Sequence, residues 1–106
     1  MKISVLINNY NYAEHIDECL DSISKQSRTA DEVIVVDDGS TDDSVETIEK
    51  HVLNVICITQ KNQGQLSAIA TAIKSSTGDI LCFLDSDDKW KPNYLQEIIA
   101  AFNAPS

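Results

Sequence analysis

The sequence predicts an α/β fold in which a four-stranded, mainly parallel sheet is flanked by helices. Four short apolar runs, rich in β-branched residues, have the composition of buried strands. Four other segments repeat apolar residues at the three- and four-residue spacing of amphipathic helices. The two kinds of segment alternate along the chain, which gives the order βαβαβαβα and favours right-handed crossovers between parallel strands.

The expected strands are nearly continuous in their apolar character, which is typical of strands that are covered on both faces. They are Ile3–Ile7, Val33–Val36, Val55–Ile58 and Ile80–Leu84. No run is long enough to cross a membrane as a helix.

Three of the expected helices carry one apolar stripe each. The stripes are Ile16, Cys19, Leu20 and Ile23; Leu66, Ile69, Ala70 and Ile73; and Leu95, Ile98, Ile99 and Phe102. The remaining helix has a weaker stripe of Val45, Ile48 and Val52. Its start is indicated by the Ser-x-x-acid pattern of Ser40 and Asp43, which is typical of an N-terminal cap.

The 106 residues fit a single domain, residues 1–106, that can bury a core without disulfides. The formal net charge of -9 disfavours nucleic acid as a partner, because nucleic acid is itself a polyanion. Three widely spaced cysteines without a CxxC pair predict free thiols in a reducing compartment. We therefore expect a cytoplasmic protein, whose parent chain could associate with the cytoplasmic face of a membrane.

Polar residues follow every expected strand. They are Asn8–Asn11, Asp37–Ser40, Gln60–Gln65 and Asp85–Asp88. In parallel sheets the carboxyl ends of the strands share one edge, and ligands bind there. The sequence therefore gathers its acidic residues at the expected ligand-binding edge.

The acidic segment FLDSDD, from Phe83 to Asp88, has three possible uses. Its carboxylates could bind a hard cation such as Mg²⁺ or Mn²⁺, act as an acid and a base, or simply be solvated. A phosphate-accepting receiver domain also combines an acid pair with a later single aspartate. In such a domain the pair does not follow the second strand, and more chain would be needed after Asp85.

Four segments, taken together, resemble the N-terminal half of a family 2 glycosyltransferase, which has a Rossmann-like GT-A fold. They are ISVLINNYNYAEHIDECLDSI, DEVIVVDDGSTDDS, NQGQLSAIATAIKSSTGD and ILCFLDSDDKWKPN, in the family's order and over nearly the whole chain. The resemblance implies transfer of a sugar from a nucleotide diphosphate donor to an acceptor. It does not name the sugar, the acceptor saccharide or the lipid-linked glycan.

The resemblance implies donor-binding roles for five residues. Asn8 and Tyr10 would line the pocket for the base. Asp37 and Asp38 form the acid pair, and Asp38 would accept a hydrogen bond from the base, typically the uracil of a UDP-sugar. Asp85 would face the ribose.

The resemblance also implies a divalent cation, Mn²⁺ or Mg²⁺, at a DxD motif. Asp87 would bind the metal beside the diphosphate, with Asp85 as the other acid of the motif. Asp88 would support the site from behind. Such a metal would stabilise the charge that builds on the departing diphosphate.

Two pairs of adjacent residues depart from the family pattern. Asn8 and Asn9 stand where the family has Pro-Thr, and Ala70 and Thr71 stand where it often has Arg-Asn. We therefore expect donor contacts at these positions to differ from those in the family.

The family's acceptor half and catalytic base lie beyond the DxD motif, so we expect a truncated donor-binding half without useful transferase activity. Its last strand, Ile80–Leu84, would then be an edge that could pair with a second copy in a homodimer. The alternative is a non-catalytic nucleotide-binding or interaction module with the same fold.

Overall fold

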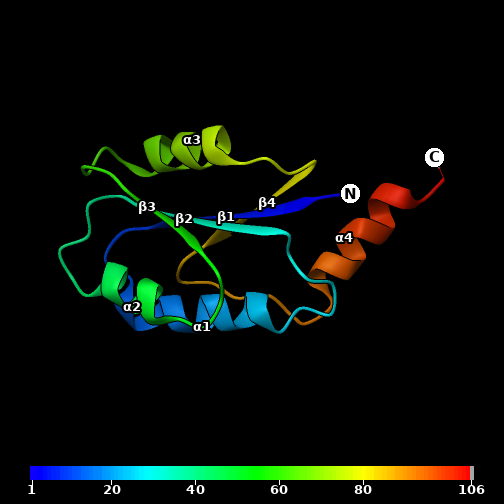
Figure 1. The fold of residues 1–106 in the computed structure, drawn as a ribbon, viewed down its shortest axis with the longest axis horizontal. Helices are drawn as coiled ribbons and strands as arrows, with labels where there is room; N and C mark the ends of the chain where they lie inside the picture. Colours follow the sequence, from blue (N-terminus) through cyan, green and yellow to red (C-terminus); the bar gives the residue numbers. More distant parts are fainter. Residues whose placement is uncertain (106) are drawn as a thin grey trace.

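The computed structural model describes residues 1–105 and has the predicted element order (Figure 1). The elements are β1 (Ile3–Asn9), α1 (Ala13–Ser24), β2 (Glu32–Asp37), α2 (Ser44–Lys50), β3 (Ile56–Thr59), α3 (Gln65–Ser75), β4 (Ile80–Asp85) and α4 (Tyr94–Asn103). The α/β prediction is confirmed.

The four strands form one sheet in the order β3-β2-β1-β4, and all three neighbouring pairs are parallel. The first three strands are added in one direction, whereas β4 returns to the free side of β1. The strand order therefore reverses between β1 and β4. In open parallel sheets this reversal leaves a crevice at the carboxyl ends of the strands, where ligands bind.

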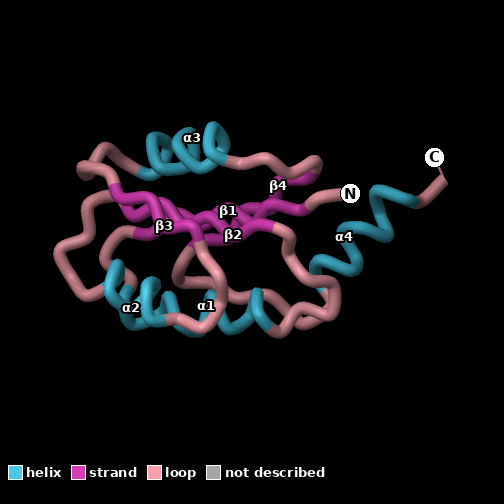
Figure 2. Tube along the Cα trace, in the orientation of Figure 1, coloured by secondary structure: helices cyan, strands magenta, loops and turns pink. Residues whose placement is uncertain are grey.

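Helices cover both faces of the sheet, with α1 and α2 on one side and α3 on the other (Figure 2). The larger core lies between the sheet and α1. There the predicted stripe of Ile16, Cys19, Leu20 and Ile23 is buried, as expected. Burial of each large aliphatic side chain contributes about 1.5–3 kcal/mol, so this interface supplies much of the stability of the fold.

The stripe predicted for α3 is wrong. Leu66 is 83% exposed and Ile73 is 44% exposed, whereas Ala68 and Ala72 are buried against the sheet. The two alanines lie four residues apart on one face, and their small side chains let the helix approach the strands closely. The size of the side chains, more than their hydrophobicity, has therefore determined which face of α3 packs against the sheet.

Two expectations about α2 are also wrong. The Ser40 hydroxyl donates to Asp37 Oδ1 at 2.6 Å and does not cap the helix. Asp42 holds the first turn instead, because its Oδ1 accepts bonds from the backbone N–H and hydroxyl of Ser44 at 3.0 and 2.5 Å. Val52 lies beyond the helix and is 93% exposed.

The side chain of Gln26 joins the end of α1 to the start of α4. Its Nε2 donates to the carbonyl oxygens of Ser22 and Lys91 at 3.0 and 2.6 Å. Its Oε1 accepts a bond of 3.0 Å from the backbone N–H of Leu95, in the first turn of α4. Nearly buried itself, Gln26 therefore provides the N-terminal cap that α4 lacks locally.

Among residues 1–105, no helix combines the length and the apolar character that crossing a membrane requires. Strand β4 is one edge of the sheet, and Phe83 on it is 50% exposed. Homodimer formation through this edge stays a prediction.

Replacing Gln26 with alanine is expected to lower the free energy of unfolding by about 1–3 kcal/mol, because three backbone groups, one of them in a buried hydrogen bond, lose their partner. Hydrogen exchange should rise most for the amides of α4. Urea denaturation and amide exchange measure both effects, with Gln96→Ala, an exposed site on α4, as the control. Equal stability of the two variants would show that the cap is unimportant.

Candidate functional site

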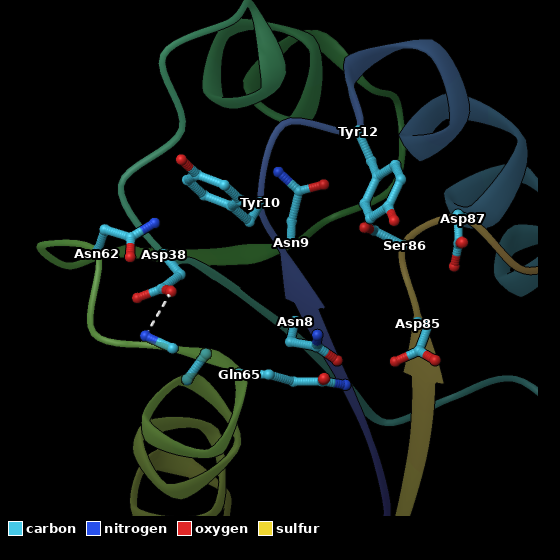
Figure 3. A pocket seen from close by; sticks show the side chains of 12 residues that line it. Asn8, Asn9, Tyr10, Tyr12, Asp38, Asn62, Gln65, Asp85, Ser86 and Asp87 are labelled. Atoms are coloured by element: carbon cyan, nitrogen blue, oxygen red, sulfur yellow. Dashed lines mark hydrogen bonds between the residues drawn. The ribbon is translucent and has the colours of Figure 1, made fainter.

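A cleft of about 420 Å³ lies at the carboxyl ends of β1 and β4, where the strand order reverses (Figure 3). Residues from both strands and from the loops beside them line it. They are Asn8, Asn9, Tyr10, Tyr12, Asp38, Asn62, Gly64, Gln65, Ala68, Asp85, Ser86 and Asp87. The cleft thus brings together four segments that are far apart in the sequence.

The ends of the paired strands β1 and β4 form the base of the cleft. Asn8 is the register partner of Asp85, so two residues expected to follow their strands lie within the sheet. Both strands are longer at this end than their apolar runs predicted. The backbone ladder therefore fixes the spacing between the polar side chains of β1 and the acidic segment.

Asp38 lies at one side of the cleft and holds the loop before α3. Its Oδ1 accepts bonds of 2.9 Å from Gln60 Nε2 and from the backbone N–H of Gln63. Its Oδ2 accepts one bond of 2.9 Å from the backbone N–H of Gly64, which leaves one Oδ2 lone pair without a partner among the described residues. Figure 3 shows Asp38 facing this loop.

The pKa of Asp38 is lowered by this arrangement. Burial acts to raise the pKa, but the hydrogen bonds from Gln60, Gln63 and Gly64 stabilise the ionised form and together outweigh it. Asp38 is therefore a fixed, charged acceptor at neutral pH.

Two glycines allow the loops around Asp38 to approach each other. Gly39 has a φ of 77°, and a Cβ there would lie 2.7 Å from the backbone nitrogen of Asn62. Gly64 has a φ of 98°, which lets its N–H turn toward the Asp38 carboxylate.

Asp37 is not among the residues that line the cleft. Its Oδ1 accepts bonds from Asn9 Nδ2 at 2.8 Å and from the Ser40 hydroxyl at 2.6 Å, and its Oδ2 accepts one from the Ser40 N–H at 2.9 Å. The structure thus gives Asp37 a role in joining β1 to the loop after β2. The donor contact predicted for it has no support from the geometry.

Asn11 joins the loops after β1 and β2 above the cleft. It adopts a φ of 56°, a region that asparagine tolerates better than most residues. Its side-chain oxygen accepts bonds from the backbone N–H groups of Thr41 and Asp42 at 2.8 and 3.3 Å. The loop that carries Tyr10 and Tyr12 is therefore held to the loop after β2.

The acidic segment after β4 divides between the cleft and the solvent. Asp85 and Asp87 line the cleft, and both are exposed. Asp88 does not line it: its N–H donates to the Asp85 carbonyl at 2.9 Å, and its Oδ1 accepts a bond from the Lys89 N–H at 2.9 Å. Asp88 thus closes the turn that presents Asp87.

The described residues contain no group of three or more His, Cys, Asp or Glu side chains arranged to hold a metal ion. The predicted trio of Asp85, Asp87 and Asp88 is therefore not arranged as a complete metal-binding site. Two carboxylates that face one cleft nevertheless fit a Mg²⁺ or Mn²⁺ ion that takes its remaining ligands from a phosphate and water.

The Cys19 thiol lies beneath the acidic segment and donates a weak hydrogen bond to the Asp85 carbonyl at 3.8 Å. Burial raises the pKa of Cys19 to about 12, and the charges of Asp88, Asp87 and Asp85 add to the increase. The thiol is therefore protonated and unreactive at neutral pH, and it supports the turn from the α1 side.

Seven further residues of the cleft were not predicted as site residues. They are Asn9, Tyr12, Asn62, Gly64, Gln65, Ala68 and Ser86. All but Ala68 lie in or directly beside the polar segments that follow the strands, so the only indication in the sequence was their position after a strand. Ser86 in particular is the middle residue of the predicted DxD motif.

A family model described as "Glycosyl transferase family 2" matches residues 4–106, nearly the whole chain. The chain belongs to glycosyl transferase family 2. An uncharacterized glycosyltransferase of Nostoc sp. is 42% identical to it over 106 residues, which are 96% of this chain and 33% of that protein. The chain thus spans about one third of the length of this relative.

Two solved structures of glycosyltransferases share the fold of this family 2 chain. Staphylococcus aureus TarS in complex with UDP has a TM-score of 0.87 at 35% identity, over 94% of this chain and 31% of that one. The mannosyltransferase PcManGT from Pyrobaculum calidifontis, in complex with GDP-Man and Mn²⁺, has a TM-score of 0.88 at 30% identity, over 98% and 33%. The predicted resemblance and the GT-A fold are confirmed.

We expect Asp38→Asn to lower the free energy of unfolding by about 1–3 kcal/mol at neutral pH, because charge-assisted bonds to the loop before α3 are weakened. The pKa of Asp38 is lower in the folded protein than in the unfolded chain. Its stabilising effect is therefore fully present above the unfolded pKa, near 4, and is lost as the pH falls through the folded value.

Denaturant unfolding of this variant and of the unchanged chain, between pH 7 and pH 2, measures the difference. The two stabilities should converge below about pH 4. Asp17→Asn, at an exposed acid on α1 outside the cleft, is the matched control. A difference between Asp38→Asn and the unchanged chain that stays constant over this range would contradict the role given to Asp38.

Proposed function

We propose that the cleft binds the nucleoside diphosphate part of a nucleotide sugar, in an enzyme that transfers the sugar to an acceptor. One observation carries the proposal: Asp38 and the pair Asp85 and Asp87 line a single cleft from opposite sides (Figure 3). A charged acceptor on one side suits the N–H of a base. Two exposed acids on the other side suit a cation that a diphosphate also binds.

The base would lie against Asp38. One lone pair of Asp38 Oδ2 is free to accept the N–H of uracil, while the other lone pairs hold the loop. Asn8 and Tyr10 provide a polar and an aromatic wall. UDP is the nucleotide in the TarS complex, which supports a UDP-sugar as the donor.

A divalent cation would be held by Asp85 and Asp87. The chain has a net charge of -9, so a diphosphate approaching this acidic edge needs positive charge to offset the repulsion. Mn²⁺ accompanies GDP-Man in the PcManGT complex, which supports Mn²⁺, and Mg²⁺ prefers the same oxygen ligands. When bound, the cation would stabilise negative charge on the diphosphate leaving group.

The residues of this chain would bind and orient the donor. The carboxylates that line the cleft are those of Asp38, Asp85 and Asp87, and the proposal uses all three for binding. The base that deprotonates the acceptor would therefore come from outside residues 1–106. We expect the chain by itself to bind a donor without transferring its sugar at a useful rate.

Binding of UDP in the presence of Mn²⁺ is expected to weaken at least about tenfold in Asp87→Asn, or about 1.4 kcal/mol, because one anionic metal ligand is lost. Without Mn²⁺, the variant and the unchanged chain should bind equally weakly. Isothermal titration calorimetry measures all four cases. Asp17→Asn removes the same charge from an exposed site on α1 outside the cleft and should bind like the unchanged chain.

Two results would count against the proposal. Binding that does not depend on Mn²⁺, and is unchanged in Asp87→Asn, would remove the metal from the account and favour a non-catalytic nucleotide-binding module. No binding of UDP or GDP at millimolar concentration would contradict the nucleotide site itself.

A further inference from the structure

Two side chains outside the cleft connect the middle of α3 to Asp38. The Thr71 hydroxyl donates to Gln60 Oε1 at 2.7 Å, and Gln60 Nε2 donates to Asp38 Oδ1 at 2.9 Å. Asp38 lines the cleft, whereas Gln60 and Thr71 do not. Thr71 therefore reaches the carboxylate through one intermediate side chain, that of Gln60.

The direction of each hydrogen bond in this connection follows from the charge of Asp38. An ionised carboxylate can only accept, so the nitrogen of the Gln60 amide must face it. The oxygen of the amide then faces Thr71 and needs a donor, which the Thr71 hydroxyl supplies. This hydroxyl also bonds the carbonyl oxygen of Ser67, but at 3.0 Å that bond is the longer of the two. A flipped amide would place its oxygen against the carboxylate.

The Gln60 side chain is held along its whole length. Its backbone N–H donates to the Asp37 carbonyl at 2.9 Å, which continues the pairing of β2 with β3 by one residue. Its Nε2 lies 3.3 Å from Ser67 Oγ, one turn of α3 before Thr71. Gln60 and Thr71 are both half-buried. The amide therefore has one well-defined position between α3 and the end of β2.

Gln60 is the one side chain among the described residues that bonds the Asp38 carboxylate. Burial acts to raise the pKa of Asp38, and the bond from Gln60 is the largest of the three that lower it. The other two come from the backbone N–H groups of Gln63 and Gly64, which do not depend on side-chain identity. The choice of residue 60 therefore affects this carboxylate more directly than the choice of any other bonding partner.

We propose that Gln60 is a positioning residue of the nucleotide site and that Thr71 sets the orientation of its amide. The inference rests on the proposed function, in which Asp38 accepts a bond from the base. Gln60 and Thr71 keep this carboxylate in one orientation and as an acceptor only. The inference also gives a role to Thr71, which stands where this chain departs from the family pattern.

An acceptor held in this way discriminates between pyrimidine bases. Uracil has a ring N–H that can donate to Asp38, whereas cytosine has an unprotonated ring nitrogen at the same place. That nitrogen is itself an acceptor, and it would lie against the carboxylate without a proton between them. Loss of the Gln60 bond would let the carboxylate turn and would favour its ionised form less. The preference for UDP over CDP should therefore fall.

Gln60→Met keeps the length of the side chain and removes the amide. In the presence of Mn²⁺, affinity for UDP should weaken about threefold to tenfold, and affinity for CDP should change less. Affinity for pyrophosphate should stay the same, because it has no base and would bind through the cation at Asp85 and Asp87, across the cleft from Asp38 (Figure 3). Isothermal titration calorimetry with the three ligands measures these effects.

Thr71→Val removes the hydroxyl and keeps the branched side chain, whereas Thr71→Ser keeps the hydroxyl. Thr71→Val should weaken UDP binding about twofold to fivefold, and Thr71→Ser should bind like the unchanged chain. In a double-mutant cycle, Thr71→Val should have no further effect on a chain that carries Gln60→Met. Thr47→Val on α2 is the matched control, because the Thr47 hydroxyl also bonds the carbonyl four residues earlier but lies outside the cleft.

Three results would overturn the inference while leaving the proposed function intact. Unchanged UDP affinity, with an unchanged ratio of UDP to CDP affinity, in Gln60→Met would show that Gln60 does not position Asp38. Equal weakening for UDP, CDP and pyrophosphate would show that Gln60 only stabilises the fold. Independent effects of Gln60→Met and Thr71→Val would remove Thr71 from the account. If the unchanged chain bound neither UDP nor pyrophosphate, the proposed function and this inference would fail together.

Discussion

The parallel pairing of β1 with β4 is the interaction on which the rest of the structure depends. It joins the first strand of the chain to the last, and it places Asn8 beside Asp85. Because β2 occupies the other side of β1, the strand order must reverse at this point. The reversal opens the crevice that the loops then line. The topology of the sheet therefore sets the position of the cleft, and the side chains of the loops set its chemistry.

The acidic residues at this edge divide into two groups by their hydrogen bonds. Asp37, Asp38 and Asp42 accept bonds from the neighbouring loops, which offset their charge and hold those loops together. The exposed carboxylates of Asp85 and Asp87 accept no such bond from the described residues, so their charge is left for a ligand to offset. This difference, more than the number of acids, distinguishes structural carboxylates from the proposed metal ligands.

The sequence predicted the elements and the end of the sheet at which the polar residues gather, because long-range topology follows from the alternation of strands and helices. It did not predict the rotation of α3, because Ala68 and Ala72 are buried through their small size, which a hydrophobic stripe does not reveal. Nor did the sequence show that the neighbouring acids Asp37 and Asp38 have different hydrogen-bond partners and different positions relative to the cleft. Both are acids at the carboxyl end of β2, and only the folded chain shows that Asp37 binds Asn9 and Ser40 whereas Asp38 lines the cleft.

The central claim is that the cleft at the carboxyl ends of β1 and β4 binds a nucleoside diphosphate. Amide chemical shifts during titration with UDP and Mg²⁺ test this claim most directly. The account predicts the largest shifts at the cleft, in residues 8–12, 62–65 and 85–87 and at Asp38. It predicts little change at the amino ends of the strands, near Asp31 and Gly78. Shifts concentrated elsewhere, for example around Trp90 and Pro92, or no shifts at saturating nucleotide, would contradict it.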